Sequence, residues 1–326
     1  MDTGEEFPEE QATPRLCKPR HPMFYFRSGD VVFVCEDTSF RVQSDLLSCN
    51  SQVFSGMLER GRLDGVHLRD GCPCVHLSDA AEDFATLLRV FYTPGCVRSP
   101  PCLGYTNTDL LHCRFPHRRK TPDFATFSSL LRMTTKYQFK ELRSQILLDL
   151  LPAYPTKLSE YEKSSCRGET VFGSPTPHPH SVLNLFLACN VGFALPFAYY
   201  RACIAGDPAS FATSAEEAAL PPDTLEMALR GQARLKREEV GLAKKVAFRD
   251  CAKGGELAGR RAEVFNWIHP GMVTQSGILE RGEFKESKYC APCSQSCVQE
   301  LSEAKENTWE NLPSYFGLPP WETTVP

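Results

Sequence analysis

No run of eighteen consecutive apolar residues occurs in this 326-residue chain, so no segment is long and apolar enough to form a transmembrane helix. The opening residues, MDTGEEFPEE, lack both the basic start and the apolar stretch of a secretory signal. Asn-x-Ser/Thr glycosylation acceptors are also absent. These absences predict a soluble protein of the cytosol or the nucleus that has no membrane partner.

An excess of basic residues is missing as well. The formal net charge is −4 and the pI is near 6.1, so the chain lacks the electrostatic footprint of a nucleic-acid-binding protein. Direct nucleic-acid binding is therefore not expected. The local run His117-Arg118-Arg119-Lys120 is a candidate nuclear signal or phosphate patch, although a solvated cluster of loop charges is the favoured interpretation.

Cysteine is plentiful, but it lacks the pattern of a disulfide framework. The chain has 15 cysteines, an odd number scattered through apolar segments and not concentrated in a short secreted domain. We expect most of them to be free thiols that pack as small hydrophobic side chains.

The first half begins with short strands. Residues 31–35 (VVFVC) form a β-branched and aromatic run, which is typical of a strand buried on both faces. After a turn at Asp37-Thr38, Phe40 and Val42 alternate with polar residues, as in the second arm of a hairpin. Residues 74–77 (CVHL) predict a third strand.

Between and after these strands the apolar spacing becomes helical. Residues 46–58 predict two short helices, with Asn50 or Ser51 as the N-cap of the second. Ser78 or Asp79 is the predicted N-cap of the next helix. The apolar stripe of this helix consists of Phe84, Leu87, Leu88 and Phe91. A further helix is predicted from the stripe Phe124, Phe127, Leu130, Leu131 and Tyr137. Another helix, which ends before Pro152, is predicted from Leu142, Ile146, Leu147, Leu150 and Leu151.

The second half predicts helices alone. Residues 182–189 suggest a buried helix, and Pro196 stands where a first helical turn tolerates proline. The charged stretch 225–248 predicts a surface helix whose thin apolar stripe is Leu229, Leu235, Val240, Ala243 and Ala247. The predicted division is a disordered tail (1–22), a first domain (23–155) with an insertion (96–123), a linker (156–180) and an α-helical C-terminal domain (181–326).

Several segments of the first half resemble the BTB (POZ) family, and so does the order of the predicted elements. The matching segments are Asp30-Val31-Val32-Phe33, Phe40-Arg41-Val42-Gln43-Ser44-Asp45-Leu46-Leu47, Ser51-Gln52-Val53-Phe54-Ser55-Gly56-Met57-Leu58 and Phe91-Tyr92-Thr93. More narrowly, the chain resembles the multi-copy BTB proteins of fungi at residues 130–137 (LLRMTTKY), Leu142-Arg143, Tyr154-Pro155-Thr156, Leu195-Pro196-Phe197-Ala198 and residues 312–321 (LPSYFGLPPW). The resemblance implies an α+β fold, with a BTB/POZ domain followed by a mainly α-helical domain.

The chain also departs from the family pattern. Gln43 and Ser44 stand where many animal members carry a histidine and a basic residue, so a charged pocket that pairs such a base with Asp30 is not carried over. Residues 96–123 join two helices that the family connects more closely, and they represent either a true insertion or a gene-model artefact.

The resemblance implies an adaptor or scaffold that binds proteins, as a homodimer or a heterodimer formed through the first domain. The roles open to it include substrate adaptor of a cullin ubiquitin ligase and regulator of transcription. By resemblance, a dimer face would be lined by Met23, Phe24, Phe26, Leu46 and Leu47, for which packing inside the chain's own core is the competing interpretation. The chain is thus predicted to be no enzyme, with no catalytic or cofactor-binding residue.

One motif nevertheless matches an enzyme. Residues 112–119 fit the H-C-x5-R cradle in which phosphatases hold a thiolate (here Cys113) and an arginine (here Arg119) against phosphate. That cradle needs backbone N–H groups directed at the anion, and Pro116 removes one of them. A cysteine-dependent phosphatase is therefore the alternative function, with a chance match as the favoured interpretation.

Two groups of residues are candidate metal ligands. Cys290 and Cys293, followed by Cys297, have the spacing of a structural zinc knuckle, for which Cys203, Cys251 or His269 would supply the fourth ligand. The competing interpretation is unliganded thiols. His178 and His180 lie in a Pro-rich segment, where a solvated loop is favoured over a metal site.

Overall fold

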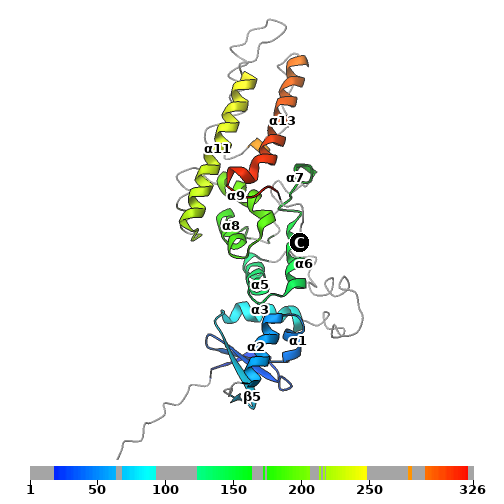
Figure 1. Cartoon of the computed structure of the whole chain (residues 1–326), viewed down its shortest axis with the longest axis vertical. Helices are drawn as coiled ribbons and strands as arrows, with labels where there is room; N and C mark the ends of the chain where they lie inside the picture. Colours follow the sequence, from blue (N-terminus) through cyan, green and yellow to red (C-terminus); the bar gives the residue numbers. More distant parts are fainter. Residues whose placement is uncertain are drawn as a thin grey trace, which may run out of the picture. The chain divides into compact units, whose positions relative to one another are not determined.

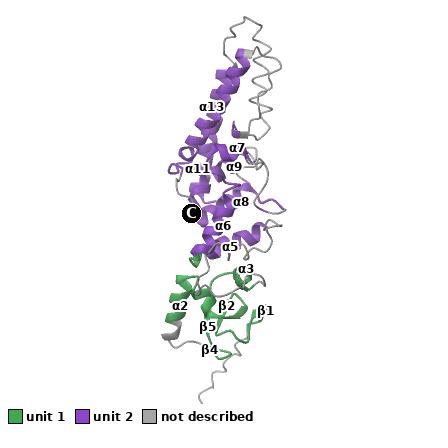
Figure 2. Cartoon of the chain, turned by 90° about the vertical axis from the view of Figure 1, so that its right-hand side faces the viewer, with its two compact units in different colours: residues 1–116, 136–139 green, residues 117–135, 140–326 purple. Residues whose placement is uncertain are grey.

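The computed structural model describes residues 18–63, 68–92, 123–163, 175–205, 218–247, 278–280 and 291–321, together with Phe172, Thr213 and Glu216. The chain divides into two compact units, coloured separately in Figure 2. Unit 1 comprises residues 1–116 and 136–139, and unit 2 comprises residues 117–135 and 140–326. In the described residues unit 1 combines a small sheet with helices and unit 2 is helical, so the chain has the predicted α+β class.

The sheet of unit 1 has the strand order β1-β3-β2-β5-β4. It lies in the blue-to-cyan part of Figure 1, where β5 is labelled. The strands are β1 (Arg20–Tyr25), β2 (Val31–Cys35), β3 (Thr38–Val42), β4 (Leu68–Arg69) and β5 (Cys72–Leu77). β2 and β3 form the hairpin predicted from the sequence, and β5 lies parallel to β2. A parallel neighbour requires a crossover, which includes α1 (Ser44–Ser48) and α2 (Gln52–Leu63).

An aromatic cluster forms the core of unit 1. Phe33 of β2 meets Phe54 of α2 and Phe84 of α3 (Ala81–Tyr92) edge to face, with ring centroids 5.5 and 5.4 Å apart. Phe40 of β3 meets Phe84 in the same manner at 5.1 Å. Edge-to-face packing is the arrangement that aromatic quadrupoles favour. The cluster therefore fixes α2 and α3 on one face of the sheet, and the predicted stripe of α3 (Phe84, Leu87, Leu88 and Phe91) is buried.

The two predicted N-caps in unit 1 had different outcomes. Ser51 caps α2, because its Oγ accepts a hydrogen bond from the backbone N–H of Phe54 at 3.1 Å. At the start of α3, the carboxylate of Glu36 accepts the N–H of Ala81 at 3.0 Å. The prediction of Ser78 or Asp79 as this cap was wrong, since both side chains accept hydrogen bonds from the Lys136 ammonium, at 3.1 and 2.6 Å.

Residues 136–139 belong to unit 1 although they follow a long stretch of unit 2 (Figure 2). The Tyr137 ring lies 4.5 Å from that of Phe54, and its hydroxyl donates to the Asp79 carboxylate. Phe139 packs against Phe54 and Phe91 at 5.7 and 5.5 Å. Burial and the bond to Asp79 both raise the pKa of Tyr137, so its hydroxyl stays protonated as the donor.

The first described strand begins before the predicted end of the N-terminal tail at residue 22. β1 starts at Arg20 and pairs in parallel with β3 through an irregular register, and β4 has only two residues. Neither strand shows the alternation that predicts strands from sequence. Most of the predicted insertion 96–123 lies outside the described residues, as do residues 1–17.

The main helices of unit 2 confirm most of the helical predictions. They are α5 (Phe124–Lys136), whose last residue belongs to unit 1, α6 (Lys140–Leu150), α7 (Leu158–Lys163), α8 (Pro179–Ala188), α9 (Leu195–Ile204), α11 (Pro222–Ala247) and α13 (Ala291–Tyr315). Asp123 caps α5 by accepting the N–H of Thr126 at 2.7 Å. The predicted stripe of α6 is buried at Leu142, Ile146, Leu147 and Leu150.

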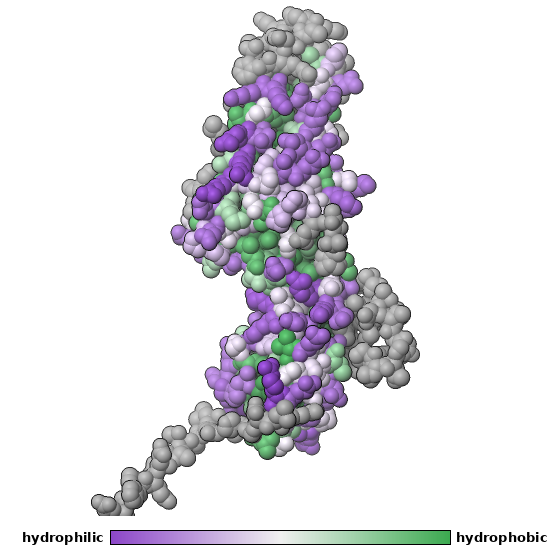
Figure 3. Space-filling view, in the orientation of Figure 1, coloured by the Kyte–Doolittle hydropathy of each residue, from purple (hydrophilic) through white to green (hydrophobic). Residues whose placement is uncertain are grey.

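The apolar face of α11 differs from the prediction. Leu229 and Val240 are 46% and 39% exposed, whereas the buried face is formed by Ala228, Gly231, Leu235, Leu242, Ala243 and Val246. Small residues are buried here because α13 packs beside α11, with Phe316 lying against Gly231. In Figure 3 the side of α11 and α13 turned to the viewer is largely hydrophilic, as a surface helix requires.

A stack of three aromatic rings lies near the C-terminal end of α13. The Trp309 ring lies between those of Tyr161 and Trp321, at 5.5 and 5.3 Å, and its Nε1 donates to the carbonyl of Thr156 at 3.2 Å. Gly317, with φ of +65°, ends the helix and turns the chain back. Trp321 is held by a hydrogen bond from its Nε1 to the Trp309 carbonyl at 2.8 Å.

The division into units differs from the predicted domains. Contacts group α5 and α6 with the C-terminal helices, whereas the prediction placed them in a first domain that ends at residue 155. The predicted linker 156–180 contains α7 and the start of α8. Tyr161 of α7 is buried in the aromatic stack, so this part of the predicted linker belongs to the packed core of unit 2.

Candidate protein-interaction surface

Tyr92, at the end of α3, joins the two elements that the sequence assigned to an interface. Phe26, just after β1, stacks on the Tyr92 ring with centroids 4.7 Å apart. The Tyr92 hydroxyl donates to the Gln43 side-chain oxygen and accepts the Gln43 backbone N–H at 3.1 Å, immediately before α1. The end of β1 and the start of α1 therefore lie beside each other. Burial raises the pKa of Tyr92, which keeps its hydroxyl a donor.

Asp30 holds the first turn of α1. Its two carboxylate oxygens accept the backbone N–H and the hydroxyl of Ser44, both at 2.6 Å. A carboxylate at this end of a helix also interacts favourably with the backbone dipoles. Among the described residues, the hydrogen-bond partner of Asp30 is thus the neutral residue Ser44.

The five predicted interface residues fall into two groups. Phe24 and Leu47 are 2% and 0% exposed in the single chain, so they pack within unit 1 as the competing interpretation has it. Met23 is 61% exposed, and Phe26 and Leu46 are half-buried. Surface for a partner therefore remains at Met23, Phe26 and Leu46, and their role in an interface stays a prediction.

His21 shapes β1 in a way that sequence reasoning missed. Its ring stacks on Phe24 and Phe40, at 5.0 and 4.9 Å, and its Nδ1 accepts the N–H groups of Met23 and Phe24 at 3.2 Å. Burial, and then the nearby Arg89, lower the pKa of His21, which keeps Nδ1 an acceptor. Because β1 is an edge strand, using two of its N–H groups inside the chain limits the pairing it offers to another strand.

The zinc prediction is divided between described and undescribed residues. Cys290 lies outside the described residues, as do Cys251 and His269, two of the residues considered as a fourth ligand. Cys293 and Cys297 lie one turn apart on α13, half-buried and buried. Cys203 is buried, and its thiol contacts the Ala228 carbonyl at 3.4 Å. The described residues contain no group of three metal-ligating side chains, and the zinc knuckle stays a prediction.

His178 and His180 lie at the start of a helix, and the solvated-loop interpretation was wrong for His180, whereas His178 is exposed. His178 is the N-cap of α8, and its ring accepts the backbone N–H of His180. His180 is fully buried, and the Nδ1 atoms of the two rings are 3.1 Å apart. At this separation the Nδ1 of one ring donates a hydrogen bond to the Nδ1 of the other. This bond cannot form when both imidazole rings are protonated and positively charged, because neither Nδ1 can then accept.

The histidine pair predicts a pH dependence of the stability of unit 2. Burial, and then the charge of His178, lower the pKa of His180 from 6.5 to about 4. Between these two values the unfolded chain binds a proton that the folded chain does not, so stability present above pH 6.5 is lost as the pH falls. From pH 7 to about pH 5.5 the expected loss in unfolding free energy is about 1 kcal/mol.

Urea unfolding followed by tryptophan fluorescence at both pH values measures this loss. The variant His180→Phe should show a flatter dependence on pH, while His76→Gln, which changes an exposed histidine of unit 1, should retain the wild-type slope. Equal slopes for the wild type and His180→Phe would contradict the assignment.

Two further candidate sites from the sequence fall on residues that the structure does not describe. The phosphatase-like motif at residues 112–119 and the basic run at 117–120 are outside the described residues. Among the helices that the structure describes, none combines the length and apolar character needed to cross a membrane.

Comparison of the chain with protein-family models, with curated proteins and with solved structures found no match.

Proposed function

We propose that the chain is a protein-interaction adaptor or scaffold in which unit 1 acts as a BTB/POZ-like module. One observation carries the proposal: the segments that resemble the family occur in one small fold, in the family's order. β2, β3, α2 and α3 meet at the rings of Phe33, Phe40, Phe54 and Phe84. Asp30 bonds to the start of α1, and Tyr92 at the end of α3 bonds to Gln43 just before it. The resemblance in sequence and the packing thus support the same assignment.

Burial makes four of the described thiols poor nucleophiles, whereas the candidate Cys113 lies outside the described residues. A nucleophilic cysteine needs a lowered pKa and access to substrate. Burial instead raises the pKa of Cys35 to about 12, and it raises the pKa values of Cys74, Cys189 and Cys203. Buried thiols of this kind also suit the reducing cytosol or nucleus.

We propose that the exposed parts of β1 and α1 mediate self-association. Met23 presents an unbranched apolar side chain, and Phe26 and Leu46 keep part of their surface accessible. A few well-packed side chains near the centre of an interface supply most of its affinity. A two-fold axis beside α1 would pair these residues with their own copies.

The full-length chain is expected to be a dimer whose mass in light scattering is twice the 36.5 kDa of one chain and stays constant on dilution. Replacing Met23 and Leu46 by aspartate (Met23→Asp with Leu46→Asp) should weaken the dimer at least about 100-fold, because a carboxylate would be buried without a partner. The matched control is Leu148→Asp, which places the same charge on an apolar residue of unit 2 that is 43% exposed.

A wild-type chain that is monomeric at every concentration would contradict the homodimer. The adaptor function would then rest on heterotypic partners. Within it, the cullin branch is tested by purifying the chain with its partners from native lysate, and a partner set without a cullin removes that branch and leaves a regulatory scaffold.

A further inference from the structure

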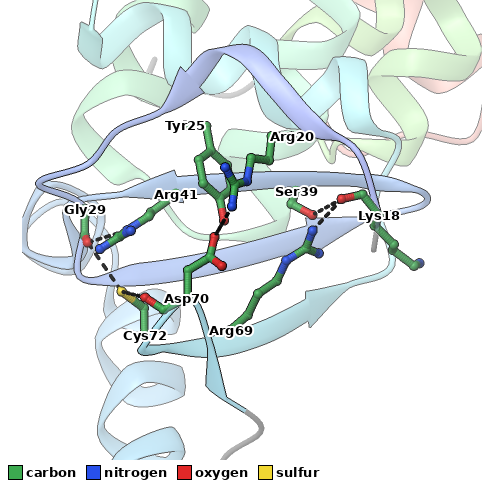
Figure 4. Close-up of polar contacts among 9 residues, drawn as sticks. All are labelled: Lys18, Arg20, Tyr25, Gly29, Ser39, Arg41, Arg69, Asp70 and Cys72. Atoms are coloured by element: carbon green, nitrogen blue, oxygen red, sulfur yellow. Dashed lines mark hydrogen bonds and ion pairs between the residues drawn. The ribbon is translucent and has the colours of Figure 1, made fainter. Parts of the chain in front are cut away.

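The sheet of unit 1 has a second face, opposite the aromatic core. Tyr25 pairs with Arg41, Arg41 with Val32, and Val32 with Cys74, so these four side chains project to the same side. Val32 and Val34 are buried there together with Cys72, and Cys74 packs against them. In Figure 4 this face is crossed by polar side chains from β1, β3 and the β4–β5 turn.

The polar layer is a network of hydrogen bonds and ion pairs. Asp70, in the β4–β5 turn, accepts from the Tyr25 hydroxyl and lies 2.8 Å from the Arg20 guanidinium. The bond from Tyr25 and the charge of Arg20 lower the pKa of Asp70. Arg69 donates to the carbonyl of Lys18, and Arg41 donates to the carbonyl of Gly29 at 2.8 Å (Figure 4).

The charges of this layer do not cancel. Its cations are Lys18, Arg20, Arg41 and Arg69, whereas its carboxylates are Asp70 and Asp37, the latter 3.6 Å from the Lys18 ammonium. Arg41 and Arg69 are half-buried and contact neutral carbonyls, with no carboxylate at ion-pair distance among the described residues. Asp70 acts on Arg69 over a longer distance, since the charge of Arg69 also lowers the pKa of Asp70. A partly desolvated guanidinium without a carboxylate at ion-pair distance still attracts an anion.

The sequence contains an acidic segment next to this face. Residues 2–10 (DTGEEFPEE) carry five carboxylates and neither lysine nor arginine. Residues 11–17 connect this segment to Lys18, and a stretch of seven residues spans at most about 24 Å when fully extended. Five strands spaced about 4.8 Å apart are about 19 Å wide. The segment can therefore reach every part of the face.

From the uncancelled charge and the short connection, we infer that the basic face formed by Lys18, Arg20, Arg41 and Arg69 binds acidic extended peptide and that residues 2–10 of the same chain occupy it. A connection of this length holds the segment at an effective concentration of about millimolar, so a weak electrostatic contact suffices. An acidic segment of another protein would bind this face by displacing residues 2–10. The inference is independent of the proposed self-association at β1 and α1.

The test uses the full 326-residue chain with a fluorophore on its α-amine and measures the anisotropy of the dye. A docked segment tumbles with the folded unit, whereas a released segment moves on the nanosecond timescale. Raising the salt from about 0.1 M to about 1 M shortens the Debye length from about 10 Å to about 3 Å, so the wild-type anisotropy should fall about twofold. Converting the five carboxylates to amides should give the low value already at about 0.1 M salt; these changes are Asp2→Asn, Glu5→Gln, Glu6→Gln, Glu9→Gln and Glu10→Gln.

A second variant changes the face. Arg41→Gln with Arg69→Gln should release the segment to the same extent, while Arg237→Gln, which removes an exposed arginine of unit 2, should leave the anisotropy unchanged. Because Arg41 and Arg69 also bond to backbone carbonyls, the amide variant decides the test if this double variant fails to fold, since it alters no described residue.

Two results would overturn the inference. One is a wild-type anisotropy that responds neither to salt nor to the amide substitutions. The other is an anisotropy that responds to both but rises with protein concentration, which would assign residues 2–10 to the face of a second copy.

Discussion

Replacing Phe54 by alanine is expected to lower the unfolding free energy of unit 1 by about 3–5 kcal/mol. Phe54 is fully buried and lies at the centre of the aromatic core, within 6.4 Å of the rings of Phe33, Phe84, Tyr137 and Phe139. Removing the ring leaves a cavity among side chains from α3, β2 and residues 136–139. These side chains cannot all move inward at once, so the lost contacts are not recovered.

Hydrogen exchange of the β2 and β5 backbone, combined with urea unfolding followed by circular dichroism, measures the loss. Leu68→Ala is the control in the same unit, because it truncates a side chain that is 69% exposed and should change stability by less than about 0.5 kcal/mol. A loss below about 1 kcal/mol for Phe54→Ala would mean that the aromatic cluster does not hold the sheet and helices together.

Gly231→Ala is expected to destabilise unit 2, although alanine favours helices over glycine. A Cβ atom at Gly231 would lie 2.0 Å from a ring carbon of Phe316, well inside van der Waals contact. Phe316 is 1% exposed and stacks on Tyr199 at 4.9 Å, so its ring has no free space into which to move. Overpacking of this kind costs about 1–3 kcal/mol, which exceeds the gain of up to about 1 kcal/mol in helix propensity.

Gly241→Ala, in the same helix, is the matched control. No atom lies within 4 Å of a Cβ added at Gly241, so only the propensity gain applies and unit 2 should become more stable by about 0.5–1 kcal/mol. Tryptophan fluorescence during urea unfolding reports on both variants, since Trp309 and Trp321 lie in unit 2. Effects of the same sign at the two positions would contradict the packing of Phe316 against α11.

The parts of the fold that the sequence predicted are those in which one regular period decides burial. The continuous apolar run of β2 and the stripe of α3 each form a complete pattern, and both are buried as expected. The α1–α2 pair and the Ser51 cap followed from residues close together in the chain. Because these patterns depend only on residues close together in the chain, packing against distant segments does not alter the elements they predict.

The parts that could not be predicted depend on distant residues. The cap of α3 comes from Glu36, which is 45 residues away from Ala81. The buried face of α11 is set by Phe316, and it uses Ala228 and Gly231, which carry little hydrophobic signal. Along α13 the buried positions include Ser294, Lys305 and Thr308, so no apolar period marks this helix in the sequence.

The candidate surface shows the same limit. The sequence resemblance identified the segments around Met23 and Leu46, but side-chain direction decides which residues face solvent. The hydrogen bonds that the His21 ring accepts from Met23 and Phe24, and the bond between Asp30 and Ser44, help to set that direction. The basic face was likewise hidden, because Lys18, Arg20, Arg41 and Arg69 are far apart in the chain and meet only through the sheet.

Residues 136–139 belong to unit 1 but follow residues 117–135 of unit 2, and this order limits when the core of unit 1 can be completed during synthesis. The ribosome releases the β1–β5 sheet and α3 well before Tyr137 and Phe139, so the aromatic core lacks two of its rings during that interval. Closing a loop of this length costs entropy, and the contacts made by residues 136–139 help to offset it. The nascent chain therefore carries an incomplete apolar core while residues 93–135 are synthesised, and it is during this interval that a chaperone would have a surface to bind.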